Sequence, residues 1–160
     1  MQVKDVMTTD LCCCLPEDSA IKAARLMKQM DAGSIPVVAS EVDPTLLGVV
    51  TDRDLCMAVI AEGLDPSTVT LEECMSTPVI ATLPEEDIEN AVNLMRDYQI
   101  RRVPVVTRTG ALAGIVSTAD VFRRSDVAAT KTHEALATVS ELFYKRYGRR
   151  HFGGGGILFN

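Results

Sequence analysis

The stretch Gly48-Val49-Val50-Thr51-Asp52-Arg53-Asp54 recurs sixty-six residues later as Gly114-Ile115-Val116-Ser117-Thr118-Ala119-Asp120. Each copy runs from a β-branched apolar segment into a hydroxyl residue and ends, three residues later, on an aspartate. β-Branched residues favour strands, whereas Ser, Thr and Asp favour the first positions of helices. The stretch therefore predicts the same strand-to-helix corner twice in one chain.

Further matches upstream keep the same order at a spacing of sixty-eight residues. Residues 6–9 align with 74–77, residues 15–18 with 83–86, and residues 35–38 with 103–106. The spacing changes between Val38 and Gly48, where Asp43-Pro44 predicts a turn, and turns tolerate insertions. We therefore interpret the chain as a tandem internal repeat.

Each repeat has the pattern of a β-α-β-β-α unit. Apolar runs at 11–15 and 79–83 predict a first strand, and a Pro-acid pair then begins a helix with apolar residues at helical spacing. Two β-branched runs follow in each repeat and predict a hairpin. These hairpins comprise 35–39 with 46–51, and 103–107 with 112–117. A second helix is predicted from Asp52 to about Ala61, and from Thr118 to about Arg124.

A unit of about 60 residues buries too little surface to be stable alone. We therefore predict a mixed α/β or α+β fold in which two repeats, residues 1–66 and 67–125, pack face to face with pseudo-twofold symmetry. An apolar stripe at 126–147 predicts a further helix, which either packs on the repeats or forms a dimer contact. Four consecutive glycines within 148–160 predict a flexible basic tail.

Composition is that of a globular protein, with 47% hydrophobic residues and a formal net charge of −6 over 160 residues. No apolar run reaches the roughly 20 residues of a membrane span, and the N-terminus does not resemble a signal peptide. A cytoplasmic protein with no membrane partner is therefore expected. All 22 acidic residues precede Lys145, and an acidic body argues against nucleic-acid binding.

The five cysteines do not form a disulfide framework, because their number is odd and three are consecutive. We interpret Cys12, Cys13 and Cys14 as strand thiols of a protein from a reducing compartment. A zinc site would need spaced ligands that converge, and only two histidines are available, so no metal is expected. No Ser–His or Cys–His arrangement and no Walker loop is found, so neither catalysis nor a catalytic cofactor is expected.

The two corners carry chemistry that suits a nucleoside phosphate. Free N–H groups at a helix start attract phosphate, and a carboxylate accepts hydrogen bonds from vicinal ribose hydroxyls. Thr51 with Asp54, and Ser117 with Asp120, place these two groups one helical turn apart. The alternative is that each pair only caps its helix. Repetition in register favours the ligand-binding interpretation.

Taken together, the motifs over about residues 3–124 resemble the cystathionine β-synthase (CBS) domain. The resemblance implies a tandem pair, or Bateman module, built as a flat pseudo-symmetric disc with two clefts between its halves. It implies an adenosine ligand such as AMP, ADP, ATP or S-adenosylmethionine. It also implies a homodimer, and regulation of a separate effector protein whose identity the sequence does not give.

The resemblance further implies that Asp54 and Asp120 bind ribose, and that Thr51 and Ser117 contact phosphate or ribose. Arg101 and Arg102 would face a phosphate chain, unless they are only solvated surface charges. The first repeat has Gly33 and Ser34 at these positions, so the two clefts are expected to differ.

Arg53 is a further candidate for a phosphate contact, and Ala119 stands in its place in the second repeat. By resemblance, the first strands supply backbone groups for the adenine edge, and the second strands wall the cleft. The residues implied are Leu11, Cys12, Val79 and Ile80 for the edge, and Ile35, Pro36, Val103 and Pro104 for the walls. For each of them, plain core packing is the alternative.

Three functional hypotheses follow. The first is a sensor that binds an adenine nucleotide and signals its occupancy to a partner or to its own dimer. The second is a ligand-free dimerisation or interaction scaffold that uses the helix beginning near Ser125. The third is a nucleic-acid or redox-linked adaptor that uses the basic tail or the thiols. We favour the first, because it accounts for both corners at once.

Overall fold

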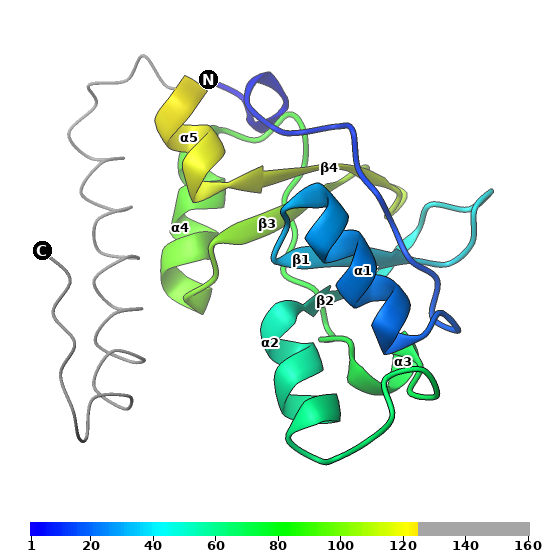
Figure 1. The fold of residues 1–160 in the computed structure, drawn as a ribbon. Coiled ribbons are helices and arrows are strands. Elements are labelled where there is room, and N and C mark those ends of the chain that lie inside the picture. The colour runs from blue at the N-terminus through cyan, green and yellow to red at the C-terminus, as the bar shows by residue number, and fades with distance from the viewer. Residues whose placement is uncertain (125–160) are drawn as a thin grey trace, which may run out of the picture.

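The computed structural model describes residues 1–124. In chain order the elements are η1 (Val3–Asp5), α1 (Ala20–Met30), β1 (Ser34–Val38), β2 (Leu46–Thr51), α2 (Asp52–Leu55), η2 (Cys56–Ile60), α3 (Leu71–Cys74), α4 (Ile88–Tyr98), β3 (Arg102–Val106), β4 (Leu112–Ser117) and α5 (Thr118–Arg124) (Figure 1). The helix predicted at 126–147 and the tail predicted at 148–160 lie outside the described residues.

Two antiparallel hairpins form the sheets, as predicted. β1 pairs with β2 so that Ile35 lies opposite Val50, and β3 pairs with β4 so that Val103 lies opposite Val116. The register shifts at the same place in both hairpins, between the fourth and fifth residues of β1 and of β3. The fold is therefore mixed α+β, and its two halves share one plan down to the position of the irregularity.

The first strand predicted in each repeat is reduced to a single parallel bridge, and this part of the prediction is wrong. Cys14 N–H donates to the Pro36 carbonyl, and Val38 N–H donates to the Cys14 carbonyl. A longer ladder would next need an N–H from Pro36, which proline lacks. Thr82 meets Pro104 and Val106 in the same way in the second repeat.

The helices α1 and α4 form where apolar residues recur at helical spacing. α1 buries Ala20, Ala23 and Met27, and α4 buries Ile88, Ala91, Val92 and Met95. Both helices end on a left-handed residue, Asp31 with φ 49° and Gln99 with φ 55°. Such a residue stops the helix and turns the chain toward the next strand, and so fixes where β1 and β3 begin.

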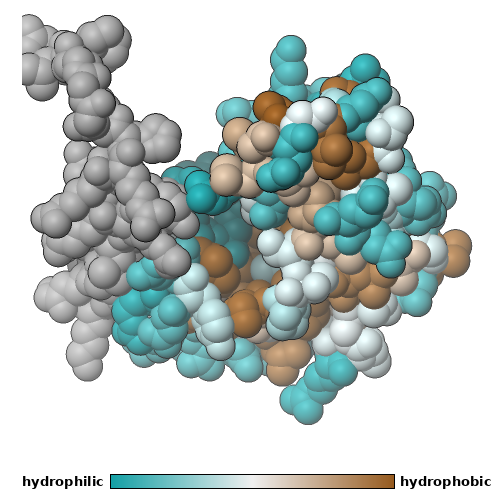
Figure 2. Space-filling model, turned by 90° about the horizontal axis from the view of Figure 1, so that it is seen from below, coloured by the Kyte–Doolittle hydropathy of each residue, from teal (hydrophilic) through white to brown (hydrophobic). Residues whose placement is uncertain are grey.

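The second helix of the first repeat begins at Asp52 as predicted, but it widens after Leu55. η2 is π-helical, and Ala61 N–H donates to the Cys56 carbonyl five residues earlier. The apolar side chains of Met57, Ile60 and Leu64 are 53, 70 and 50% exposed. The face seen from below, where α2 faces the viewer, carries hydrophobic patches among hydrophilic ones (Figure 2).

The repeats exchange their opening segments. Val3 and Val6 belong to the core of the second repeat, with α4, β3, β4 and α5, whereas Leu71 and Cys74 belong to the core of the first. Backbone hydrogen bonds follow the exchange. Thr8 forms a two-way pair with Ile115 in β4, and Ser76 forms the equivalent pair with Val49 in β2.

Matched hydrogen bonds across the molecule confirm the predicted pseudo-twofold symmetry. Leu46 N–H donates to the Gly110 carbonyl at 3.0 Å, and Leu112 N–H donates to the Pro44 carbonyl at 2.8 Å. These two bonds exchange places when the repeats are interchanged. Backbone hydrogen bonds therefore join the two hairpins directly where the repeats pack face to face.

Candidate functional site

The corner between β2 and α2 is closed by a reciprocal cap. The Thr51 hydroxyl accepts from Asp54 N–H at 3.1 Å, while Asp54 Oδ2 accepts from the Thr51 N–H and hydroxyl at 2.8 Å each. The capping alternative raised by the sequence is therefore present in the structure. The second oxygen, Oδ1, lies 3.4 Å from the Ser76 hydroxyl, so its contact with the protein is looser.

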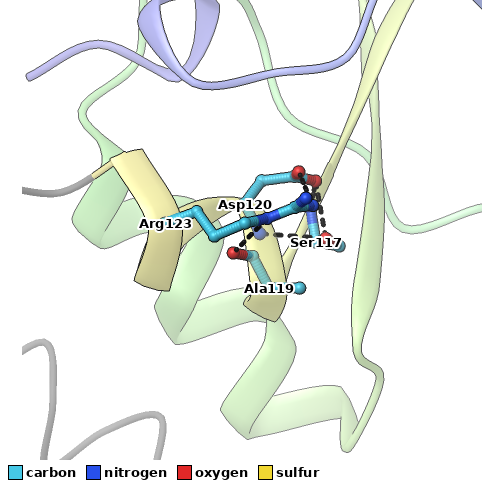
Figure 3. A network of polar contacts seen from close by, with 4 residues as sticks. All are labelled: Ser117, Ala119, Asp120 and Arg123. Atoms are coloured by element: carbon cyan, nitrogen blue, oxygen red, sulfur yellow. Dashed lines mark hydrogen bonds and ion pairs between the residues drawn. The ribbon is translucent and has the colours of Figure 1, made fainter.

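The corner between β4 and α5 has the same cap with one addition. Asp120 Oδ2 accepts from the Ser117 N–H and hydroxyl, and Arg123 donates to Asp120 Oδ1 at 3.1 Å (Figure 3). Met57 occupies the position of Arg123 in the first repeat. Asp120 is also only 8% exposed. The second carboxylate thus has an ion pair at its second oxygen, where the first has only the 3.4 Å contact with Ser76.

A cavity of about 340 Å³ lies between the repeats, beside the first corner. The first repeat lines it with residues from β1, β2 and the start of α2. The second repeat lines it with its opening segment and with the chain that leads into β3. The described lining residues are Gly33, Ser34, Val49, Thr51, Asp52, Arg53, Ser76, Pro78, Val79, Ile80, Gln99, Ile100, Arg101, Arg102, Pro104 and Ile115.

Charged side chains from both repeats contribute to this lining. Arg53 and Asp52 come from the first repeat, and Arg101 and Arg102 from the second. A Cβ placed on Gly33 would lie 3.3 Å from Asp52 Oδ2 and 3.5 Å from Arg102 Nη1. Gly33 therefore marks a place where side chains of the two repeats approach each other, and a larger residue there would crowd both.

The rest of the lining is largely apolar. Val49, Ile80, Ile100 and Ile115 contribute hydrocarbon side chains, together with Pro104. Because Pro104 has no N–H, the parallel bridge at Thr82 cannot extend back to the Ile80 carbonyl. A flat heterocycle could therefore lie among these side chains with a backbone acceptor at its edge.

The structure brings together seven of the residues singled out in the sequence. The cavity is lined by Thr51, Arg53, Val79, Ile80, Arg101, Arg102 and Pro104. Asp54 is not among the described lining residues, but it contacts Ser76, which is. Ser117 and Asp120 form the other corner. Ile35 and Val103 are 2 and 0% exposed and belong to the two hydrophobic cores, Pro36 is buried in β1, and Leu11 and Cys12 are half-buried elsewhere.

Several lining residues were not predicted from the sequence. Asp52 belongs to the repeated motif, and its charge there could have identified it as a candidate. Its position near Arg102, however, depends on how the repeats pack. Ser76 carries the hydroxyl of the Met-Ser pair and reaches the first corner because the opening segments are exchanged. Gln99, Ile100 and Pro78 have no pattern in the sequence that would have identified them.

The thiols lie apart from the cavity lining. Cys14 and Cys74 are buried, Cys12 and Cys13 are half-buried, and Cys56 is exposed. Burial and, to a smaller extent, the nearby Asp18 carboxylate raise the pKa of the Cys14 thiol to about 11. Within residues 1–124, no cluster of three His, Cys, Asp or Glu side chains has a metal-binding arrangement. No helix in that part of the chain is long and apolar enough to cross a membrane.

Comparison with protein families identifies the repeats. The family model for the CBS domain matches residues 3–61 and again residues 71–127. This chain belongs to the CBS domain family. The pair is 41% identical, over 119 residues, to the CBS domain-containing protein YhcV of Bacillus subtilis; the match covers 74% of this chain and 81% of that protein.

Solved CBS pairs have the same fold. The CBS pair of protein MJ0100, in complex with 5-methylthioadenosine and S-adenosyl-L-methionine, superposes with a TM-score of 0.68 at 28% identity, covering 77% of this chain and 94% of that one. CBSX2 in complex with AMP superposes with a TM-score of 0.65 at 27% identity, covering 76% and 93%. Both of these solved proteins are thus bound to adenosine compounds.

Proposed function

We propose that this CBS pair is a regulatory module that binds an adenine nucleotide in the cavity between its repeats. The observation that carries the proposal is the lining itself, which combines three arginines with an apolar slot in one space shared by both repeats. A volume of about 340 Å³ falls in the range of small-molecule sites, roughly 300–1,000 Å³. Related pairs bound to AMP or S-adenosyl-L-methionine support the choice of ligand.

Each part of the ligand has a proposed partner. The phosphate lies near the Thr51 corner, where the three arginines of the lining favour negative charge. The ribose lies beside Ser76 in the lining, and Asp54 reaches its hydroxyls by exchanging the 3.4 Å contact between Oδ1 and Ser76. The adenine lies beside Val79 and Ile80. Asp120, held by Arg123 at its second oxygen, is the less available carboxylate, so we place one nucleotide per chain.

Signalling follows from the position of the cavity. A ligand shifts a conformational equilibrium only by the difference in its affinity for the two states. A nucleotide in this cavity contacts both repeats, so its binding favours the arrangement of the halves that completes the site. An effector protein, or a second copy of the chain, then responds to that arrangement.

The experiment is calorimetry and thermal unfolding of the full chain with AMP, ADP, ATP and S-adenosylmethionine. At about 100 times the Kd, binding stabilises the folded state by about 2.7 kcal/mol, which raises the melting temperature by several degrees. Arg102→Gln is expected to weaken nucleotide binding at least about ten-fold, and Ile80→Trp to fill the slot and abolish it. Arg108→Gln, an exposed arginine outside the described lining, is the matched control.

Two results would overturn the proposal. One is the absence of binding by any of the four compounds. The other is unchanged affinity in both cavity variants, with circular dichroism showing that each is folded. In the latter case the ligand occupies another place, and the corner at Ser117 and Asp120 would be the next site to mutate.

A further inference from the structure

The cavity carries a single acid among its described charged residues, and that acid has a defined orientation. Asp52 Oδ1 accepts from the backbone N–H of Arg53 at 2.7 Å. Its other oxygen, Oδ2, is directed toward Gly33, where Arg102 Nη1 also approaches. The carboxylate and the guanidinium thus lie within 3.5 Å of one point on the cavity lining. A phosphate held by Arg102 beside Gly33 therefore lies near Asp52 as well.

This pair of charges at the helix start is particular to the first repeat. Thr118 and Ala119 occupy the positions of Asp52 and Arg53 in the second repeat. The cap itself, by contrast, is the same at both corners. The cap therefore does not require Asp52, and the extra acid has an effect on charge that the second corner lacks.

The charges of the described lining balance those of a short phosphate. Arg53, Arg101 and Arg102 against Asp52 leave about two positive charges. A phosphate monoester carries about two negative charges at neutral pH, and each further phosphate adds about one more. The formal charge of the lining thus matches that of the monoester, whereas a triphosphate brings further negative charge close to the Asp52 carboxylate, where like charges repel.

We propose that the cavity selects a nucleoside monophosphate over the corresponding triphosphate, and that Asp52 is the residue that sets this limit. The proposal rests on the proposed function, because it concerns the same site. The volume of about 340 Å³ acts in the same direction, since it lies near the lower end of the usual range. Arg102 attracts both ligands, and Asp52 discriminates between them.

The test is calorimetric titration of the full chain with AMP and with ATP, in EDTA and at low ionic strength, where charge effects are least screened. The wild-type chain is expected to bind AMP at least about ten-fold tighter than ATP. Asp52→Asn is expected to raise the affinity for both ligands. The gain in affinity should be at least about three-fold larger for ATP than for AMP. Glu85→Gln removes an exposed carboxylate outside the described lining and should leave both affinities unchanged.

The outcomes separate this inference from the proposed function. If the wild-type chain binds ATP as tightly as AMP, or if folded Asp52→Asn keeps the wild-type ratio, the inference is wrong and nucleotide binding stands. If the chain binds neither compound, both proposals are wrong. The ratio of AMP affinity to ATP affinity is measured on the wild-type chain alone, so the inference can be tested even if Asp52→Asn does not fold.

Discussion

Met7, in the opening segment of the first repeat, lies against Gly114 in β4 of the second. A Cβ on Gly114 would lie 2.8 Å from Met7 Sδ and 2.9 Å from the Thr8 carbonyl oxygen. Thr8 is also the residue that forms the two-way hydrogen-bonded pair with Ile115. The glycine of the repeated motif is therefore required by the segment of the other repeat that crosses it.

Gly114→Ala is expected to destabilise the fold by about 1–2 kcal/mol. Overpacking costs about 1–3 kcal/mol, and the lower entropy of the unfolded alanine variant offsets part of that. Gly48→Ala should cost less, because its nearest neighbours are side-chain atoms of Met75, which can move, rather than a backbone carbonyl. Urea unfolding monitored by circular dichroism measures both, and equal stability of the two variants would contradict the argument.

Asp120→Ala is expected to reduce the free energy of unfolding by about 1–2 kcal/mol, because it removes a helix cap and leaves Ser117 without its partner. Arg123→Met removes only the exposed guanidinium of the ion pair. It should change the free energy of unfolding by about 0.5 kcal/mol or less. Thermal unfolding without nucleotide separates the two. A loss of stability in Arg123→Met equal to that in Asp120→Ala would show that the ion pair, rather than the cap, stabilises this corner.

The Asp18 carboxyl is expected to make the free energy of unfolding depend on pH. Burial opposes its ionisation, but hydrogen bonds from the Leu15 N–H and from Lys22 prevail and lower the pKa of the carboxyl. A lowered folded-state pKa contributes stability above the unfolded pKa of about 4, and this is lost as the pH falls through the folded value. Asp18→Asn should therefore cost about 1 kcal/mol at pH 7 and progressively less below pH 4. A cost that is the same at pH 7 and pH 3 would refute this role.

The thiols should differ in reactivity. Cys56 is exposed, whereas burial raises the pKa of Cys14 to about 11 and also raises the pKa of Cys74. The thiolate is the reactive form, so at pH 8 Cys14 should be alkylated at least about 100-fold more slowly than Cys56. Mass spectrometry after timed labelling measures this, and Cys56→Ser should remove the fast phase. Rapid labelling of Cys14 in the folded chain would contradict its burial.

The homodimer remains a prediction, and η2 offers a place to test it. Ile60 is 70% exposed and Met57 53% exposed on this segment, and exposed apolar groups of this kind favour association. Ile60→Glu with Met57→Glu is expected to shift the chain from dimer to monomer in light scattering. Glu62→Gln, on an exposed neighbour, should leave the mass unchanged. A wild-type chain that is monomeric at all concentrations would dismiss the dimer.

Much of the local structure could be predicted from the sequence. The hairpins, α1, α4 and the two corners follow from apolar periodicity and from side chains that favour caps, because these preferences act over a few residues. The strands predicted at 11–15 and 79–83 were wrong for an equally local reason. Pro36 and Pro104, which were predicted only as cleft walls, interrupt the ladder that would have paired these strands.

The repeated motif by itself determined that the chain has two equivalent halves, each with a capped strand-to-helix corner, since those features depend on neighbours in sequence. Only the tertiary structure decided that the opening segments change places, and that Asp52 and Arg102 meet beside Gly33. Residues so far apart in the chain are brought together by the burial of two small apolar faces against each other, and a periodic pattern specifies that such a face exists but not which partner covers it.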